Sequence, residues 1–222
     1  MTIQHHPSDP TLASFAAGTL DEGRSLVVAT HLSKCPACRE AIAAFEGFGG
    51  AMLEDAEPLA VDETALARAL GAISAHAPAT VPATAPAPEP RRSIAPELPA
   101  ALPAALGAYP MGAWRWIGPG VYWRHVGVPA DEGTRVFMLK AAPGIVLPDH
   151  RHTGIEWTCI LQGAFRHQHG RFGEGDFDEA DETVEHHPVV EHGIECVCLV
   201  AMQGDIRFKS WIGRAIQSFV RI

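Results

Sequence analysis

Three residues with metal-binding side chains lie close together near the start of the chain. His31, Cys35 and Cys38 occur in the segment HLSKCPAC, which places three ligands within eight positions. Imidazole and thiolate are ligands of structural zinc, and a tetrahedral ion needs a fourth ligand. Either His5 or His6 can supply it, and His6 is preferred because the proline after it restricts its backbone. The spacing predicts a zinc site; the alternative is a buried cysteine pair beside incidental histidines.

A second group of potential ligands lies more than a hundred residues further on, in the segment HRHTGIE. On a β-strand, His150 and His152 point to the same face, and Glu156 follows on the next turn or strand. His186 can provide a third imidazole, whereas His187 would face the other way. Three imidazoles and one carboxylate suit Zn, Mn, Fe or Ni. The pattern therefore predicts a second divalent metal, with zinc as the preferred ion.

The elements that must position these ligands differ between the two halves of the chain. Before residue 78, apolar residues recur at helical spacing and predict helices over 12–17 and 19–31, then from Cys35 and from Asp62. Thr19 and Glu22 have the spacing of a capping box at the start of the second helix. After residue 105, short runs of alternating apolar residues broken by Gly and Pro predict a β-barrel or double-sheet roll.

The segment between these halves is rich in proline and alanine. Eight of the eighteen prolines fall in residues 78–105, with almost no large apolar side chain to bury. Proline removes backbone hydrogen bonds, so this segment is predicted to be an extended linker. The predicted organisation is a small all-α zinc-binding domain (1–77), the linker (78–105) and an all-β domain (106–222).

Charge and composition restrict the class of partner and the location. Residues 1–75 hold ten acidic and four basic residues, and the whole chain has a net charge of −9. Nucleic-acid binding draws much of its affinity from Lys and Arg, so direct nucleic-acid binding is not expected, and a basic protein surface is a better partner. The chain lacks both a run of about 18 apolar residues and a signal peptide, which predicts a cytoplasmic protein without membrane contact.

The N-terminal pattern, an upstream histidine followed by HLSKCPAC, resembles the zinc-binding anti-sigma factors. The segment from Gly144 to Gly163 resembles the first motif of the cupin superfamily, which implies a double-stranded β-helix (jelly-roll) fold. The second cupin motif is weaker. Gly175 and His186 are present, but the expected Pro, Gly and Asn are replaced, and the residues found there are Asp181, Thr183 and Val190.

A zinc module joined to one cupin domain is similar to the ChrR-type anti-sigma factors over nearly the whole chain. The resemblance implies a non-enzymatic regulator that sequesters an ECF-type (group IV) sigma factor as a heterodimer. It also implies that the metal-binding cupin domain is needed for release under oxidative stress of the singlet-oxygen type. In this family the last helix of the zinc domain packs on the sigma factor, which gives a partner-binding role to Leu66, Leu70 and Ile73. Packing within their own helical domain is the alternative.

Two further expectations remain open at this stage. Cys196 and Cys198 lie on one side of a strand, where they serve either as core residues or as an oxidant-sensing pair. The competing function is a cupin metalloenzyme, a dioxygenase or isomerase, whose N-terminal zinc module only dimerises it. A catalytic cupin needs an open coordination position and a substrate cavity. The four predicted protein ligands could fill a tetrahedral ion, which favours a non-catalytic site, whereas an octahedral ion would leave two positions free.

Overall fold

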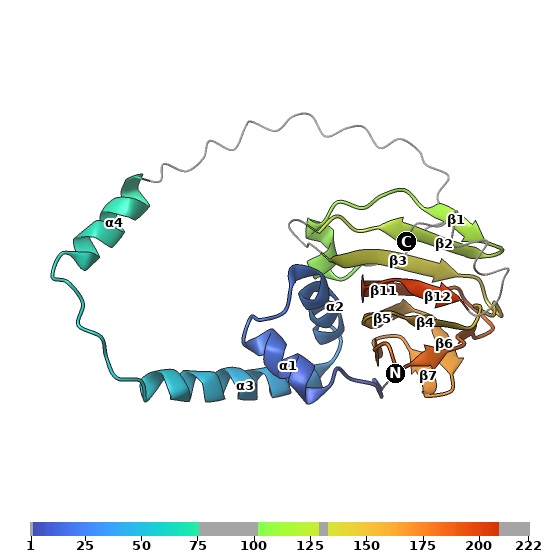
Figure 1. Cartoon of the computed structure of the whole chain (residues 1–222), viewed down its shortest axis with the longest axis horizontal. Helices are drawn as coiled ribbons and strands as arrows, with labels where there is room; N and C mark the ends of the chain where they lie inside the picture. The colour runs from blue at the N-terminus through green and yellow to red at the C-terminus, as the bar shows by residue number, and fades with distance from the viewer. Residues whose placement is uncertain (1, 76–101, 129–132, 209–222) are drawn as a thin grey trace. The chain divides into compact units, whose positions relative to one another are not determined.

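The computed structural model describes residues 2–75, 102–128 and 133–208 (Figure 1). Most of the predicted linker lies outside these residues. By contacts, residues 1–49 and 97–222 form one compact unit and residues 50–96 form another. None of the helices in the described residues is long and apolar enough to cross a membrane.

The N-terminal region forms helices, as predicted. Their bounds are α1 Asp9–Ala16, α2 Glu22–Leu32, α3 Pro36–Glu54 and α4 Ala65–Ala75, and a short 3-10 helix, η1 Ala104–Ala108, precedes the strands. The predicted start of α2 was three residues too early. Asp21 is the N-cap and accepts a hydrogen bond from Arg24 N at 2.8 Å, while the Thr19 hydroxyl donates to Ser14 O at 3.1 Å. A carboxylate three residues from the amide that it caps replaces the expected Thr–Glu pair.

The C-terminal region is an antiparallel β-fold of three sheets. The largest has the order β1-β2-β3-β11-β5-β8, and the two smaller ones have the orders β10-β6-β7 and β12-β4-β9. The strands are β1 Arg115–Gly118, β2 Val121–His125, β3 Thr134–Ala141, β4 His150–His152, β5 Glu156–Gln162, β6 Ala164–His167, β7 Gly170–Gly173, β8 Phe177–Ala180, β9 Glu185–His186, β10 Val189–Val190, β11 Cys196–Gln203 and β12 Ile206–Phe208.

The six-stranded sheet separates two apolar cores because side chains alternate along each strand. On β3, Phe137 and Ala141 belong to the core inside the β-fold, and Val136 and Met138 belong to the core on the opposite face. Gly163 turns the chain between β5 and β6 with a φ of +73°, and an added Cβ would lie 2.5 Å from the Glu195 carbonyl oxygen. Only glycine therefore fits at the last position of the first cupin motif.

Helix α2 packs on the outer face of this sheet, against β3, β5 and β11 (Figure 1). Val27 and Val28 are fully buried there, in the same core as Met138 of the sheet. Because two consecutive helical residues point in directions about 100° apart, their joint burial requires neighbours on more than one side of the helix. The helix that carries His31 is thus held directly against the β-fold.

Candidate metal centres

The first cluster joins the N-terminal segment to the turn between α2 and α3. His6 Nδ1 lies 3.4 Å from Cys35 Sγ and 3.3 Å from Cys38 Sγ, and His31 Nε2 lies 3.2 Å from Cys38 Sγ. The four donor atoms all lie within 4.8 Å of one another. An imidazole and a thiolate on one tetrahedral zinc ion would lie about 3.6 Å apart, so this donor set fits a metal.

The secondary structure explains why these ligands converge. His31 lies in the last turn of α2, and Cys35 immediately precedes the first turn of α3, so Cys38 follows one helical turn later. The Cys38 amide points at Cys35 Sγ, 3.4 Å away, which uses one of the unpaired amides at the helix start. His5 is not part of the cluster: its ring stacks on Phe172 with centroids 4.1 Å apart. Of the two histidines left open by the sequence, the structure brings His6 to the cluster.

Burial shifts the pKa values of two residues in this cluster, His31 and Cys38. Desolvation lowers the pKa of His31 to about 4 and, as the largest cause, raises the pKa of Cys38 to about 12. A helix N-terminus favours a thiolate, but burial outweighs this effect for Cys38. A bound cation must therefore displace the proton from this sulfur.

The second cluster lies where β4, β9 and the start of β5 meet. β4 pairs with β9 so that His150 is opposite His186, and Glu156 begins β5. His186 Nε2 lies 2.9 Å from His150 Nε2 and 3.2 Å from His152 Nε2, and Glu156 Oε2 lies 3.5 Å from His152 Nε2. Two imidazoles on one tetrahedral zinc ion would lie about 3.3 Å apart. Because the ring nitrogens point at one another at these distances, the donors fit a shared ion.

The electrostatics of this cluster also suit a metal. Desolvation lowers the pKa of His152 to about 4 and that of His186 to about 2, so both rings are neutral and keep a lone pair for a metal. His150 Nδ1 lies 2.7 Å from the Pro148 carbonyl oxygen and donates to it, which leaves Nε2 free to bind an ion. Desolvation raises the pKa of Glu156 to about 7.

The departures from the second cupin motif do not displace His186. Asp181 Oδ1 accepts hydrogen bonds from the Thr183 amide at 2.8 Å and from its hydroxyl at 2.5 Å, which forms a turn without the expected glycine. Val190 fills a place in the inner core. His187 points away from the cluster, as expected from strand alternation, and its Nδ1 lies 2.8 Å from Asp149 Oδ1.

The turn between β7 and β8 connects the β-fold to the first cluster. His31 Nδ1 lies 2.8 Å from the Gly175 carbonyl oxygen, so this ring donates to the β-fold and turns its Nε2 toward Cys38. The next residue, Asp176, accepts hydrogen bonds from the amides of Gln4 at 2.7 Å and His5 at 3.0 Å, just before His6. Two ligands of the first cluster are therefore oriented by one turn of the β-fold.

The same turn leads toward the second cluster through strand β8. Phe177 lies edge-on to His31, with ring centroids 5.8 Å apart. Asp178 Oδ2 lies 3.0 Å from His167 Nε2, and the His167 ring centroid lies 5.4 Å from that of His186. His167, Asp178 and His186 also form a third group of close potential ligands.

The remaining predicted site residues are placed as follows. Cys196 and Cys198 are buried in the inner core, and neither forms a disulfide. Burial raises the pKa of Cys196 to about 12, and that of Cys198 well above its usual value, so both are poor nucleophiles. Leu66, Leu70 and Ile73 on α4 are 71, 55 and 71 % exposed.

Metal affinity at the two clusters should depend differently on pH. At the first cluster, both sulfurs must bind as thiolates, and Cys38 alone gives up a proton whose pKa is about 12, so affinity should rise at least tenfold per pH unit. At the second cluster the imidazoles are already neutral, and only Glu156, with a pKa of about 7, must lose a proton. From pH 6 to 8 the dissociation constant should fall at least a hundredfold at the first cluster and about tenfold at the second.

Competition with a chromophoric chelator at pH 6, 7 and 8 measures these slopes. His186→Ala isolates the first cluster and Cys38→Ser isolates the second. Equal slopes in the two variants would contradict the assignment of protonation states.

Comparisons with known proteins agree with this architecture. Residues 108–204 match the family model described as the ChrR cupin-like domain. The chain is 40 % identical over 224 residues to the anti-sigma-E factor ChrR of Cereibacter sphaeroides, with all of both chains covered. It is 37 % identical to a chain in the crystal structure of Rhodobacter sphaeroides SigE in complex with the anti-sigma ChrR, with a TM-score of 0.68, covering 91 % of this chain and 100 % of that one.

More distant similarity extends to other cupins. An RmlC-like cupin protein from Ralstonia eutropha is 18 % identical, with a TM-score of 0.40, covering 48 % of this chain and 70 % of that one. The full-length match at 40 % identity is the one that decides the family, and it confirms the resemblance inferred from the two motifs. The chain belongs to the ChrR family of anti-sigma factors.

Proposed function

We propose that this protein binds an ECF-type (group IV) sigma factor as a heterodimer and keeps it from RNA polymerase. The observation that carries the proposal is the full-length similarity to an anti-sigma factor, together with the solved complex of a 37 % identical chain with SigE. The competing function, a cupin metalloenzyme with a dimerisation module, has no comparable support from a full-length relative. Co-purification of the chain with the ECF-type sigma factors from the same organism tests the proposal, and failure to form a one-to-one complex with any of them would contradict it.

Zinc is the proposed ion at the first cluster. Two thiolates and two imidazoles in a closed tetrahedral arrangement are a common structural zinc set. The ion would tie the N-terminal segment to the turn between α2 and α3, which stabilises a module with a small core. At the second cluster we propose a divalent ion with zinc preferred, although its donors also suit other metals. Metal analysis of the purified chain, with the Cys38→Ser and His186→Ala variants, assigns each ion to its cluster.

We assign sigma-factor binding and release to different predicted domains. Residues 1–77 bind the sigma factor, residues 78–105 join the parts, and the cupin domain (106–222) is needed for release on oxidative stress of the singlet-oxygen type. The contacts of His31 with Gly175 and of Asp176 with the segment before His6 support this role, because a change in the β-fold would alter the orientation of two ligands in the first cluster.

The proposed partner-binding surface is the apolar face of α4. Leu66, Leu70 and Ile73 recur at i, i+4 and i+7 and are more than half exposed, an arrangement typical of helices that pack against a partner. On the second half of α3, Phe48 and Met52 form a similar exposed pair, 68 and 62 % exposed. The sequence analysis had not selected these two residues.

Truncating the α4 face should weaken sigma-factor binding without affecting folding. The double variant Leu66→Ala/Leu70→Ala should raise the dissociation constant at least tenfold, because apolar anchors at an interface each contribute about 1 kcal/mol or more. Its melting temperature should be unchanged, because both side chains are exposed in the free chain. Arg68→Ala, a polar exposed position between them, is the matched control and should bind normally. If the double variant binds the sigma factor as tightly as Arg68→Ala does, α4 is not part of the interface.

A fragment ending at Ala77 should still inhibit the sigma factor, because it retains the first cluster and all four helices. Its zinc affinity should be lower than that of the full chain, because His31 loses the Gly175 carbonyl that orients it. Loss of such a partner commonly costs about 10- to 100-fold in metal affinity. A sigma-dependent promoter reporter and a zinc titration measure the two effects. A fragment that binds zinc but fails to inhibit would make the β-fold part of the sigma-binding surface.

A further inference from the structure

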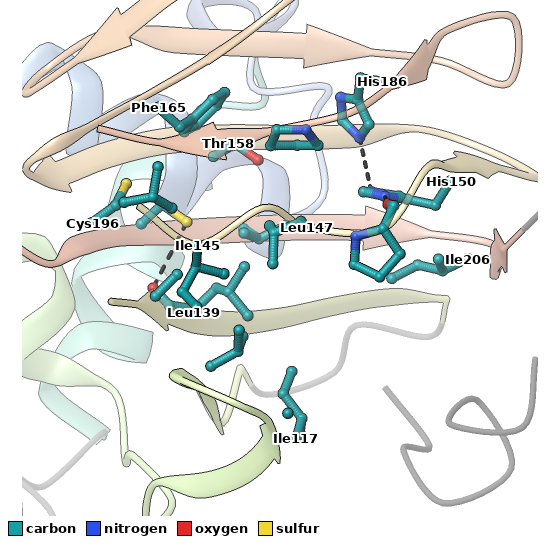
Figure 2. Close-up of a pocket in the computed structure, with 18 of the residues that line it drawn as sticks. Ile117, Leu139, Ile145, Leu147, His150, Thr158, Phe165, His186, Cys196 and Ile206 are labelled. Carbon is teal, nitrogen blue, oxygen red and sulfur yellow. Dashed lines mark hydrogen bonds between the residues drawn. The ribbon is translucent and has the colours of Figure 1, made fainter. Parts of the chain in front are cut away.

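A cavity of about 370 Å³ lies inside the β-fold, next to the second metal cluster (Figure 2). It lies between the six-stranded sheet and the two three-stranded sheets, since its lining includes residues of β3, β5 and β11 on one side and of β4, β6, β9, β10 and β12 on the other. Its volume falls within the range of small-molecule sites, about 300–1,000 Å³. At about 30 Å³ for a water-sized group, it has space for about a dozen such groups.

The cavity has one polar end and one apolar end. His150, Glu156 and His186 line the polar end. Aliphatic and aromatic side chains line the rest, among them Leu139, Ile145 and Phe165. In Figure 2, His150 and His186 lie at one end of the pocket and Cys196 lies at the other. The strand register agrees with this view. On β11, Met202 pairs with Glu156 and Cys198 pairs with Ile160. Glu156 at the polar end and Cys198 at the apolar end are therefore four residues, or about 13 Å, apart along the strands.

The charges at the polar end indicate the sign of a ligand. A divalent ion with three neutral imidazoles and the Glu156 carboxylate carries a net charge of +1. Two further carboxylates line the cavity, and each has a basic partner: Asp178 lies 3.0 Å from His167, and Asp205 lies 3.6 Å from Arg135. Neither Lys nor Arg occurs among the described residues of the lining, so the ion is their one source of positive charge. A single anionic group neutralises it, and zinc with four protein ligands can accept a fifth.

We propose that this cavity binds a medium-chain aliphatic carboxylate, with the carboxylate on the metal and the hydrocarbon chain along the apolar lining. The space for about a dozen groups matches a ligand such as octanoate, with about ten non-hydrogen atoms. Apolar burial along Leu139 and Ile145 supplies affinity, and the metal selects the anionic head. The proposal rests on a metal at the second cluster but not on the sigma factor.

The chain's own last residues are the competing occupant, because β12 lines the cavity with Ile206 and Phe208 immediately before them. Residues 209–222 contain Lys209, Arg214 and Arg221, whose charge has the same sign as the proposed ion. They also contain Trp211 and Phe219, and fourteen residues exceed the space available. Charge and size therefore both favour a small anion over this segment.

Calorimetric titration of the metal-loaded full chain with octanoate, octanol and acetate tests the proposal. Octanoate should bind at least tenfold more tightly than octanol, which lacks the charge, and than acetate, which lacks the chain. Leu139→Trp fills the cavity and should weaken octanoate binding at least tenfold while the metal content stays at two ions per chain. Ile194→Trp, at a position that is 60 % exposed and outside the lining, should bind like the original chain.

Each other outcome overturns the proposal. Equal binding of octanol would show that the metal does not hold the head group, and normal binding by Leu139→Trp would place octanoate elsewhere. Binding that appears only after residues 209–222 are deleted would identify the chain's own segment as the occupant. If octanoate binds neither the full chain nor the chain that lacks residues 209–222, medium-chain carboxylates are excluded as ligands of the cavity. If Leu139→Trp loses metal or folds poorly, Ile145→Phe, outside the strands, replaces it in the same comparison.

Discussion

Replacing Cys38 with serine should abolish inhibition of the sigma factor. Cys38 Sγ is the central donor of the first cluster, within 3.3 Å of both His6 Nδ1 and His31 Nε2. Structural zinc contributes about 10–16 kcal/mol to the folding of small zinc modules. Loss of one ligand should therefore release the N-terminal segment from the α2–α3 turn. We expect the affinity for the sigma factor to fall at least a hundredfold, a loss of about 2.7 kcal/mol or more.

The adjacent histidines provide a matched pair for the same test. His6→Ala removes a ligand and should resemble Cys38→Ser, whereas His5→Ala removes a ring that stacks on Phe172 outside the cluster. A pull-down with the sigma factor and a zinc assay on each variant give the comparison. Normal binding by a zinc-free Cys38→Ser protein would show that the ion is not needed for the contact, and equal loss in both histidine variants would point to a general disturbance of the N-terminal segment.

Replacing His186 with alanine should have the opposite pattern: inhibition is kept and induction by oxidants is lost. His186 is buried, and its Nε2 lies between those of His150 and His152, so its removal should disable the second cluster. The first cluster and the α4 face are unchanged in this variant. In a sigma-dependent reporter, we expect the oxidant response of about tenfold or more to fall to background, the size of change that a coupling free energy of 1–3 kcal/mol produces.

His187→Ala is the matched control because the neighbouring side chain points outward and contacts Asp149. It should retain both inhibition and induction. Constitutive reporter activity in His186→Ala would mean that the second cluster supports the sigma-factor contact itself. An unchanged oxidant response would place the sensor outside that cluster.

The residues that could be predicted from the sequence are those whose ligand geometry is local. His31, Cys35 and Cys38 lie within about two turns of helix–turn–helix, and His150 and His152 lie on one face of one strand. Such spacings fix the direction of side chains without knowledge of the rest of the fold. His6 and His186 are remote in sequence from their clusters. They were chosen by the proline after His6 and by the position of His186 in a cupin motif, and the structure brings both to the expected donors.

The contacts between the α-helical and β-rich parts could not be predicted in the same way. The hydrogen bond from His31 ends on a backbone carbonyl, that of Gly175, and a carbonyl group has no sequence signature. The proline-rich segment suggested two separate bodies, yet α2 packs on the β-fold. A signal was present in the run of Leu26, Val27 and Val28, because three consecutive apolar residues cover more of a helix than one buried face requires. The division at residues 77 and 105 stays a prediction.

The central claim is that metal in the β-fold permits release of a sigma factor held by the helical region. The direct measurement is dissociation of the purified heterodimer during exposure to singlet oxygen, followed by size-exclusion chromatography, for the original chain, His186→Ala and His187→Ala. We predict that the original and His187→Ala complexes separate while the His186→Ala complex stays intact. Separation of all three complexes at the same rate would contradict the claim.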